Sequence, residues 1–280
     1  MRQTQVKRHR LLWASALLFL SSLFSFTGCK AEPPKDYGVF LGIDAAQIHR
    51  LDGYRIIVIE PSELGKEDIR NLHRAGKTVY GYLNIGAIER HRPYYERFEN
   101  LTLGDYENWP EERWVDVSDS NWQAFLVDEL GREYAKKGLD GFFLDNCDVY
   151  SQYPTDASYQ GLSTILKGLK KYEIPLIVNG GSDFVFRQLE EAENAKTEIL
   201  MDGINQETVF TSIDFKNKSY GAQQEAETRY LMDYLEKAKM NGLSVYLLEY
   251  GAEPELSQKI EAYCKENGFL WYNAEGLELK

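Results

Sequence analysis

Short apolar runs alternate along the chain with segments in which apolar residues recur at helical spacing. The short runs are mostly bounded by Gly, Pro, Asn or Asp, which is typical of the ends of β-strands. Eight of them predict strands: Val39–Ile43, Arg55–Glu60, Thr78–Asn84, Trp114–Val117, Gly141–Asp145, Pro175–Asn179, Met201–Glu207 and Ser244–Glu249. The spacing between them predicts helices over Glu67–Ala75, Trp122–Lys137, Tyr159–Tyr172 and Glu225–Met240. Strands that alternate with helices indicate βαβ units and a parallel sheet.

The number of these units indicates the fold class. Eight units in about 240 residues match an α/β protein of the (β/α)8 TIM-barrel type. We therefore expect one barrel domain over residues 38–280, in which a ninth run, Phe269–Asn273, would form an extra C-terminal strand. The alternative is an open, doubly wound sheet, but no glycine-rich phosphate loop follows the first strand to support it.

Polar residues close most of the predicted strands on a single face. Side chains alternate across a strand, so Phe143 shares a face with Asp145, and Asn205 with Glu207. The same parity, at or near a strand end, is found for Glu60, Asn84, Asp116, Asn179 and Glu249. Active sites of barrels lie at the C-terminal ends of the strands, so we expect a shared cleft lined by carboxylates. The alternative is that strand ends are polar because they meet solvent, which we take as the explanation for Glu60.

Catalytic groups other than carboxylates are scarce. The four histidines show no metal-binding spacing, and the chain has no Cys-x-x-Cys pair, Walker loop or Gly-x-Ser-x-Gly elbow. We therefore expect neither a metal nor a cofactor, and favour acid–base chemistry, whose commonest carboxylate form is glycoside hydrolysis. Aromatic residues at or after strand ends, among them Tyr82 and Tyr250, are suited to stacking on sugar rings, although such residues also fill cores.

Composition and charge exclude two classes of protein. The 280 residues carry 44 acidic and 32 basic side chains, a formal net charge of −12. A chain this acidic is a poor partner for phosphate backbones, so we expect no nucleic-acid partner. Three cysteines cannot form the framework of a disulfide-rich scaffold, and the sequence leaves open whether Cys147 and Cys264 pair.

The N-terminus has the organisation of an export signal. Met1–Arg10 is basic, Leu11–Phe26 is apolar, and Thr-Gly-Cys follows. The apolar run has 16 residues, fewer than the ~20 that a transmembrane helix needs. Cys29 after Thr-Gly resembles the lipobox of bacterial lipoproteins, which implies a signal peptide over 1–28, a lipid on Cys29 and a polar tether over 29–37. The protein is then expected to be extracytoplasmic and anchored to a bacterial membrane. A plain signal peptide or an uncleaved anchor, with Cys29 incidental, is the alternative.

Five segments together resemble one family of hydrolases. They are Val79–Gly86, Trp114–Val117, Gly138–Asp148, Val178–Gly181 and Asp202–Glu207. In their order and spacing they are similar to endo-α-1,4-polygalactosaminidases and related secreted polysaccharide hydrolases, over about Gly38 to Glu275. The resemblance implies that Asp145, closing the fifth predicted strand, and Glu207, closing the seventh, are the catalytic pair. The chain departs from the family pattern at Ala87, where Gly-Glu is usual, and at Glu249, where Asp is common.

The expected function follows from this resemblance together with the carboxylate-lined cleft. We expect a monomeric glycoside hydrolase that cleaves an extracellular, galactosamine-containing polysaccharide. The residues expected to bind the substrate are Tyr82, Asn84, Asp116, Asp148, Asn179, Glu249 and Tyr250. Glu207 is expected to be the acid, because Glu has the higher unperturbed pKa. The competing hypothesis is a non-catalytic carbohydrate-binding barrel lipoprotein.

Two geometric expectations accompany the hypothesis. The carboxyl groups of Asp145 and Glu207 should lie within the range that glycosidases use, and we favour its longer, inverting part of ~6.5–9.5 Å. The segment Ala87–Arg113, long and without a clear helix, should form a wall of the cleft and bind sugar.

Overall fold

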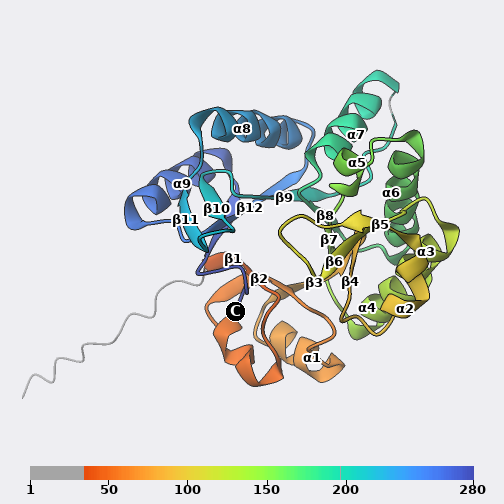
Figure 1. Cartoon of the computed structure of the whole chain (residues 1–280). Helices are drawn as coiled ribbons and strands as arrows, with labels where there is room; N and C mark the ends of the chain where they lie inside the picture. The colour runs from red at the N-terminus through yellow and green to blue at the C-terminus, as the bar shows by residue number, and fades with distance from the viewer. Residues whose placement is uncertain (1–34, 196) are drawn as a thin grey trace, which may run out of the picture. The chain divides into compact units, whose positions relative to one another are not determined.

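The computed structural model describes residues 35–195 and 197–280, and within them eight strands form one parallel sheet. The order of the strands follows the chain: β1 (Lys35–Phe40), β2 (Tyr54–Ile59), β3 (Thr78–Asn84), β7 (Gly141–Asp145), β8 (Leu176–Asn179), β9 (Gly203–Glu207), β12 (Ser244–Tyr250) and β13 (Leu270–Ala274). The last strand, β13, packs against β1, so the sheet curls into a barrel (Figure 1). This confirms the (β/α)8 class expected from the sequence.

Helices surround the barrel. The longer ones are α1 (Lys66–Arg74), α6 (Asp156–Leu169), α7 (Ser182–Ala195), α8 (Glu225–Met240) and α9 (Pro254–Asn267). The predicted helix at 122–137 is built from α3 (Ser120–Ala124), a π-helical stretch (Phe125–Gly131) and α4 (Arg132–Lys137). Short helices α2 (Tyr95–Phe98) and α5 (Val149–Gln152) lie in loops. Because side-chain oxygens of Asp119 and Thr155 accept from the first free amides of α3 and α6, these two helices begin where they do.

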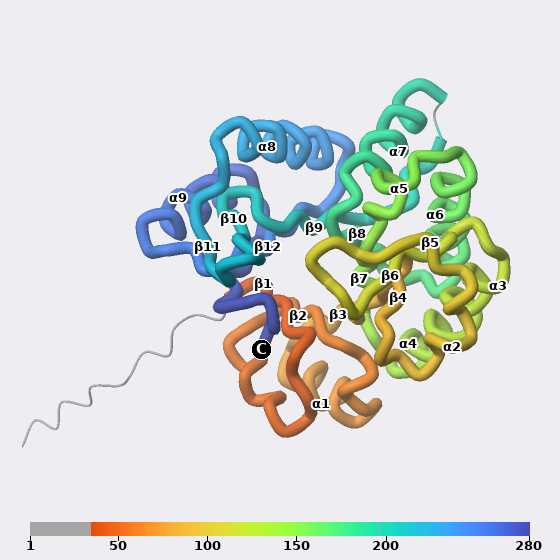
Figure 2. The backbone as a smooth tube through the Cα atoms, in the orientation of Figure 1, coloured from red at the N-terminus to blue at the C-terminus, as the bar shows by residue number. Residues whose placement is uncertain are grey.

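Two smaller sheets stand outside the barrel. One is antiparallel, with β6 (Glu112–Val115) between β4 (Ala87–Glu89) and β5 (Thr102–Asp105). The other is the hairpin of β10 (Thr211–Asp214) and β11 (Ser219–Ala222). Both follow barrel strands at their carboxyl ends, the first after β3 and the second after β9. Figure 2 shows the first of them beside the ends of β7 and β8.

The three-stranded sheet changes the assignment of two strands predicted from the sequence. The run Trp114–Val117 was expected as the fourth barrel strand, but Trp114 and Val115 belong to β6, which pairs antiparallel with β4 and β5. The run Phe269–Asn273, expected as an appendage, is β13 and completes the barrel. An apolar run does not reveal which strand it will pair with, which is why the two were exchanged. Asp145 and Glu207 consequently close the fourth and sixth barrel strands, with β8 still between them.

The first strand begins earlier than expected. Lys35–Tyr37 was assigned to the tether, but these residues form the start of β1. Tyr37 is 1% exposed, and its hydroxyl donates to Asn205 Oδ1 at 3.0 Å inside the barrel. The signal segment and Cys29 lie outside the described residues. Within 35–195 and 197–280, no helix combines the length and hydrophobicity needed to cross a membrane. Cys147 and Cys264 are both buried and unpaired.

Candidate active site

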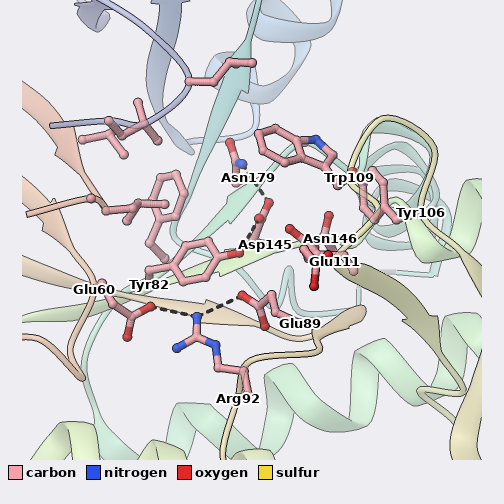
Figure 3. A pocket seen from close by; sticks show the side chains of 18 of the residues that line it. Glu60, Tyr82, Glu89, Arg92, Tyr106, Trp109, Glu111, Asp145, Asn146 and Asn179 are labelled. Carbon is pink, nitrogen blue, oxygen red and sulfur yellow. Dashed lines mark hydrogen bonds and ion pairs between the residues drawn. The ribbon is translucent and has the colours of Figure 1, made fainter. Parts of the chain in front are cut away.

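A cavity of about 1340 Å³ opens over the carboxyl ends of the barrel strands. Tyr82 of β3, Asp145 of β7, Asn179 of β8, Glu207 of β9 and Tyr250 of β12 line it. Figure 3 shows Asp145 near its centre, between Tyr82 and Asn179. The expected convergence of strand ends on one mouth is therefore confirmed for the residues just named.

One amide joins the two carboxylates implied by the family resemblance. Asn179 Nδ2 donates to Asp145 Oδ1 at 2.8 Å and to Glu207 Oε1 at 2.8 Å. The other oxygen of each carboxylate accepts from a phenol: Tyr82 donates to Asp145 Oδ2 at 2.8 Å and Tyr250 to Glu207 Oε2 at 2.7 Å. All four carboxylate oxygens of the pair are thus held in place.

The side-chain amide of Asn179 is also hydrogen-bonded on the side away from the two carboxylates. Asn205 Nδ2 donates to Asn179 Oδ1 at 2.6 Å, and Tyr37 donates to Asn205 Oδ1. Since ionised carboxylates only accept, their two contacts assign the amide nitrogen of Asn179 to them, and its Oδ1 is left to accept from Asn205. A buried network that is fully satisfied in this way is rigid.

The shared amide also limits the distance between the two carboxylates. Each bonded oxygen lies 2.8 Å from the same nitrogen, so the two oxygens are at most twice that distance, about 5.6 Å, apart. Retaining glycosidases hold their carboxyl groups at ~5–5.5 Å, and inverting ones at ~6.5–9.5 Å to admit a water. The two bonded oxygens therefore lie closer than the inverting range favoured from the sequence, because both accept from the same Asn179 nitrogen.

Burial and mutual charge hold a proton in the site. Burial, followed by the negative charge of Glu207, raises the pKa of Asp145 to about 6. Burial also raises the pKa of Glu207, against the hydrogen bonds from Asn179 and Tyr250. Two carboxyl groups this close titrate as a pair, so the raised pKa is a property of the pair as a whole.

The backbone around Asp145 explains how the strand ends approach one another. Asn146 has φ +67°, a left-handed conformation that Asn tolerates, and it turns the chain directly after Asp145. Its side chain donates to Asn84 Oδ1 at 3.0 Å. A Cβ at Gly86 would lie 1.8 Å from the carbonyl oxygen of Asn146, so only glycine allows the ends of β3 and β7 to pack this closely.

The expected substrate-binding residues divide into two groups. Tyr82, Asp148, Asn179 and Tyr250 line the cavity. Burial raises the pKa of Asp148 to about 6, against the hydrogen bond from the Gly181 amide, so Asp148 is a further titratable group beside the pair. Asn84, Asp116 and Glu249 are not among the lining residues.

Asn84 and Asp116 have local structural roles instead. Asn84 is 4% exposed, and its Oδ1 accepts from the Ala87 amide and from Asn146. Asp116 Oδ1 accepts from the amide and hydroxyl of Ser118, in the turn before α3. Asp116 was predicted to line the cavity because its strand was assigned to the barrel. Asn84 does lie at the carboxyl end of a barrel strand, but it is buried beneath the surface of the cavity.

Glu249 was expected on the wrong face of its strand. It is completely buried, and its carboxylate accepts from the amides of Phe210 and Thr211 and from the Thr211 hydroxyl. Tyr250 faces the cavity in its place. Val245–Tyr250 is buried at every position, so the sequence offered no polar alternation from which to read the inward face.

The wall formed by the segment 87–113 was expected, but its chemistry was only partly recognised. Tyr106, Trp109, Glu111 and Glu112 from this segment line the cavity, which confirms that it forms a wall. Glu112 was missed, since nothing in the sequence shows that β4 and β6 bring it inward. Arg92 Nη2 bonds Glu60 and Glu89 at 2.9 Å each, so Glu60 is more than a solvated strand end.

Aromatic rings meet across the upper part of the cavity. Trp109 from the wall and Phe215 from the β10–β11 hairpin pack edge to face, with ring centroids 6.1 Å apart. Tyr106 stacks on Trp114 at 4.1 Å. Among the described residues, no three His, Cys, Asp or Glu side chains are grouped as a metal site requires. What the cavity offers is paired carboxylates beneath aromatic rings, which suits the hydrolysis of a sugar chain.

Comparison with protein families supports this interpretation. The model of glycoside-hydrolase family GH114 matches residues 30–274. The chain belongs to this family. It is therefore a glycoside hydrolase, as the resemblance in the sequence implied. No curated protein sequence matches the chain.

Solved structures share the barrel fold of this chain. The glycoside hydrolase domain of PelA from Pseudomonas aeruginosa superposes with a TM-score of 0.72 at 17% identity, covering 88% of this chain and 96% of that one. Ega3 from Aspergillus fumigatus, in complex with galactosamine, gives 0.67 at 18%, covering 91% and 97%. The α-galactosidase TtGalA from Thermus thermophilus gives 0.55 at 13%, covering 86% and 58%. At these identities the likeness establishes the fold.

Proposed function

We propose that this GH114 protein hydrolyses a galactosamine-containing polysaccharide outside the cytoplasm, with Asp145 and Glu207 as the reacting pair and with retention of anomeric configuration. The observation that carries the proposal is the amide of Asn179, which bonds both carboxylates on the floor of an open cavity and so keeps their bonded oxygens within about 5.6 Å of each other. One carboxyl group protonates the glycosidic oxygen while the other attacks the anomeric carbon, and the first then activates the water that releases the product.

The substrate class is supported by charge. Ten carboxylates line the cavity, and the one arginine among the lining residues, Arg92, is paired with Glu60 and Glu89. A polymer that carries free amino groups is attracted to such a surface. Ega3, which shares the fold, has been crystallised with galactosamine.

Hydrolysis is tested with the soluble protein truncated before Cys29 and a panel of glycans. We expect product release from an α-1,4-linked galactosamine polymer and none from the Asp145→Asn variant. The proton signals of the newly formed anomeric centre should show retention. Inversion would contradict the retaining chemistry, and binding of the polymer without hydrolysis would support the non-catalytic barrel.

Substrates with different leaving groups can show which of the two carboxyl groups is the acid and which is the nucleophile. A variant that lacks the acid should still react with an aryl galactosaminide whose phenol needs no proton to depart, whereas a variant that lacks the nucleophile should not. We therefore compare Asp145→Asn with Glu207→Gln on the polymer and on a p-nitrophenyl glycoside. The variant that recovers on the aryl substrate identifies the acid.

The lipid anchor is proposed from the sequence of the N-terminus, since Thr-Gly-Cys29 follows an apolar run too short to span a membrane. Stable anchoring needs more than one acyl chain, as a lipoprotein carries. Cys29→Ala should release the protein from membranes while leaving its fold, measured by circular dichroism, unchanged. Retention on membranes would indicate an uncleaved anchor instead.

A further inference from the structure

The strands that carry Glu207 and Tyr250 remain joined beyond the last pair of their ladder. In the register of β9 and β12, Leu248 is the partner of Glu207, so Glu249 and Tyr250 lie past the end of β9. The residues after Glu207 form a turn that leads into β10, and Figure 1 shows the β10–β11 hairpin beside β12. The conformation of this turn therefore bears on where the carboxyl group of Glu207 lies.

The turn after Glu207 contains a strained residue. Thr208 has φ +55°, a left-handed conformation that is an outlier for a β-branched side chain. Such a conformation persists only where the surrounding structure enforces it. The Thr208 amide donates to the carbonyl oxygen of Leu248 at 2.9 Å, and the Thr208 carbonyl accepts from Gln223 Nε2 at 3.2 Å. These two bonds hold the beginning of the turn.

Glu249 holds the other end of the turn. Its Oε1 accepts from the Phe210 amide at 3.0 Å, and its Oε2 accepts from the Thr211 amide at 2.9 Å and from the Thr211 hydroxyl at 2.6 Å. The same hydroxyl accepts from the Tyr250 amide at 3.1 Å. One carboxylate therefore ties the start of β10 to the end of β12, directly beside Tyr250.

The surroundings of Glu249 suit a carboxylate and no other side chain. The hydrogen bonds that it receives from described residues come from neutral donors, and an ionised carboxylate accepts without donating. Burial raises the pKa of Glu249 to about 7, against its hydrogen bonds from Thr211 and the backbone. Burying a charge without a cation is costly. Glu249 does not line the cavity, so contact with a substrate does not account for this carboxylate.

We propose that Glu249 is a positioning residue for the catalytic pair: it fastens the strained turn to β12 and so holds Glu207 within reach of the Tyr250 hydroxyl. The inference rests on the proposed function, because it gives Glu249 a role toward the same pair. Tyr250 donates to Glu207 Oε2 at 2.7 Å, across two strands whose ladder has already ended. A relaxed turn would separate the two side chains, and the carboxylate of Glu207 would lose a donor that stabilises its charge.

The test follows the titration of the pair by NMR, which does not depend on hydrolysis. Asp and Glu carboxyl carbons are labelled in the protein truncated before Cys29, which retains the whole barrel, and Glu207→Gln identifies a signal of the pair. Glu249→Gln keeps the size of the side chain but sets an amide NH2 group against the donors of the turn. Asp202→Asn is the matched control, because Asp202 accepts from the Leu176 amide at 2.8 Å, just before β9 and outside the cavity lining.

Glu249→Gln should move the titration midpoint of the pair to higher pH by about one pH unit, since that is the scale of one hydrogen bond to a charged group. Removal of a negative charge by itself would move the midpoint to lower pH, so a rise reports the lost donor. Asp202→Asn should leave the midpoint unchanged. A midpoint that stays or falls in Glu249→Gln, or that rises equally in Asp202→Asn, would overturn the inference.

Two variants of Thr211 keep the test decisive if Glu249→Gln does not fold. Thr211→Val removes the hydroxyl that joins Glu249 to the Tyr250 amide and should also raise the midpoint, whereas Thr211→Ser retains the hydroxyl and should restore the wild-type value. Tyr250→Phe removes the donor to Glu207 directly, so adding Thr211→Val to it should cause no further rise. Equal midpoints in the Val and Ser variants, or full additivity with Tyr250→Phe, would contradict the positioning role.

The outcome is separable from that of the proposed function. A pair whose titration responds to Glu249, in a protein that cleaves no polymer, would refute the hydrolase proposal alone. A protein that cleaves the polymer, but whose pair titrates in Glu249→Gln as it does in the wild type, would refute this inference alone.

Discussion

The floor and the wall of the cavity hold their carboxylates in opposite ways. On the floor, the oxygens of Asp145 and Glu207 are all occupied, by one shared amide and two phenols. In the wall, Glu89 and Glu112 oppose each other with one buried oxygen unpartnered and one oxygen open to the cavity. All four oxygens on the floor have hydrogen-bond partners, whereas in the wall Glu89 is paired with Arg92 and Glu112 has no ion-pair partner among the described residues.

This difference corresponds to the elements that carry the two regions. The floor is made by barrel strands whose positions are fixed by the core, and such preorganisation is what catalytic groups need. The wall is an insertion after β3, which can change without disturbing the barrel. Under the proposed function, the reacting pair lies on the rigid floor, and the wall covers it from the side of an insertion.

The largest expected effect concerns the floor. Asp145→Asn and Glu207→Gln should each lower kcat on the polymer by a factor on the order of 10³, because each removes a group that takes part in bond cleavage. Initial rates with the galactosamine polymer measure the loss. A loss below tenfold in either variant would mean that the substituted residue is not one of the reacting pair, and the contrast between floor and wall would then not hold.

Removing the shared amide should give the next largest effect. Asn179→Ala takes one hydrogen bond from each carboxylate, and since those bonds lower both pKa values, the pKa of the pair should rise. The acid limb of the kcat/KM profile should move to higher pH, with a loss of about 10- to 100-fold at pH 6. Gln188→Ala removes a buried amide that bonds Tyr159 and Ser163 and does not line the cavity, so it should leave the acid limb in place. An unshifted profile in Asn179→Ala would contradict the role of the bridge.

The sequence predicted the floor better than the wall because parity is a local property. Phe143 and Asp145 share a face wherever their strand lies, so the prediction that Asp145 points inward did not depend on its neighbours. Parity failed at Glu249, where every flanking residue is buried and no alternation marks the inward face. It failed at Asp116 because the strand itself belongs to another sheet.

The wall depends on a pairing between distant segments. Glu89 and Glu112 are opposed only because β4 pairs antiparallel with β6 in one register, and no local pattern specifies that register. The bridging role of Asn179 was hidden for a similar reason, since it needs β7, β8 and β9 to be side by side. Seven of the eight barrel strands were predictable, but the short strands of the three-stranded insertion carry too weak a signal, and one of them was taken for a barrel strand.

The pH dependence of the unfolding free energy should differ between variants of Glu112 in the wall and of a glutamate on the surface. The folded protein retains a proton on Glu112 up to about pH 8, whereas the unfolded chain loses it near the ordinary value of 4.5. The stabilisation from this group is therefore full below about pH 4.5 and is lost as the pH rises toward 8. Relative to the wild type, Glu112→Gln should gain about 3–4 kcal/mol in unfolding free energy between pH 5 and pH 8, because each pH unit between the two pKa values changes stability by about 1.4 kcal/mol.

Urea unfolding at the two pH values measures this gain. The exposed control Glu107→Gln should stay within about 0.5 kcal/mol of the wild type at both. If the unfolding free energies of the wild type and Glu112→Gln depend on pH in the same way, then Glu112 is not destabilised by ionisation in the folded protein, and the contrast with the floor would not hold.

The smallest effect on catalysis should come from substitution of Trp109, an aromatic residue of the wall. Trp109 is 37% exposed and touches Phe215 edge to face, so it presents a face on which a sugar ring can stack. Trp109→Ala should raise KM for the polymer about fivefold, equivalent to about 1 kcal/mol, and leave kcat unchanged. Tyr230→Ala removes an exposed ring from α8 and should change neither parameter. A fall in kcat at constant KM would place Trp109 among the residues that act on the transition state, and the division between a binding wall and a reacting floor would no longer hold.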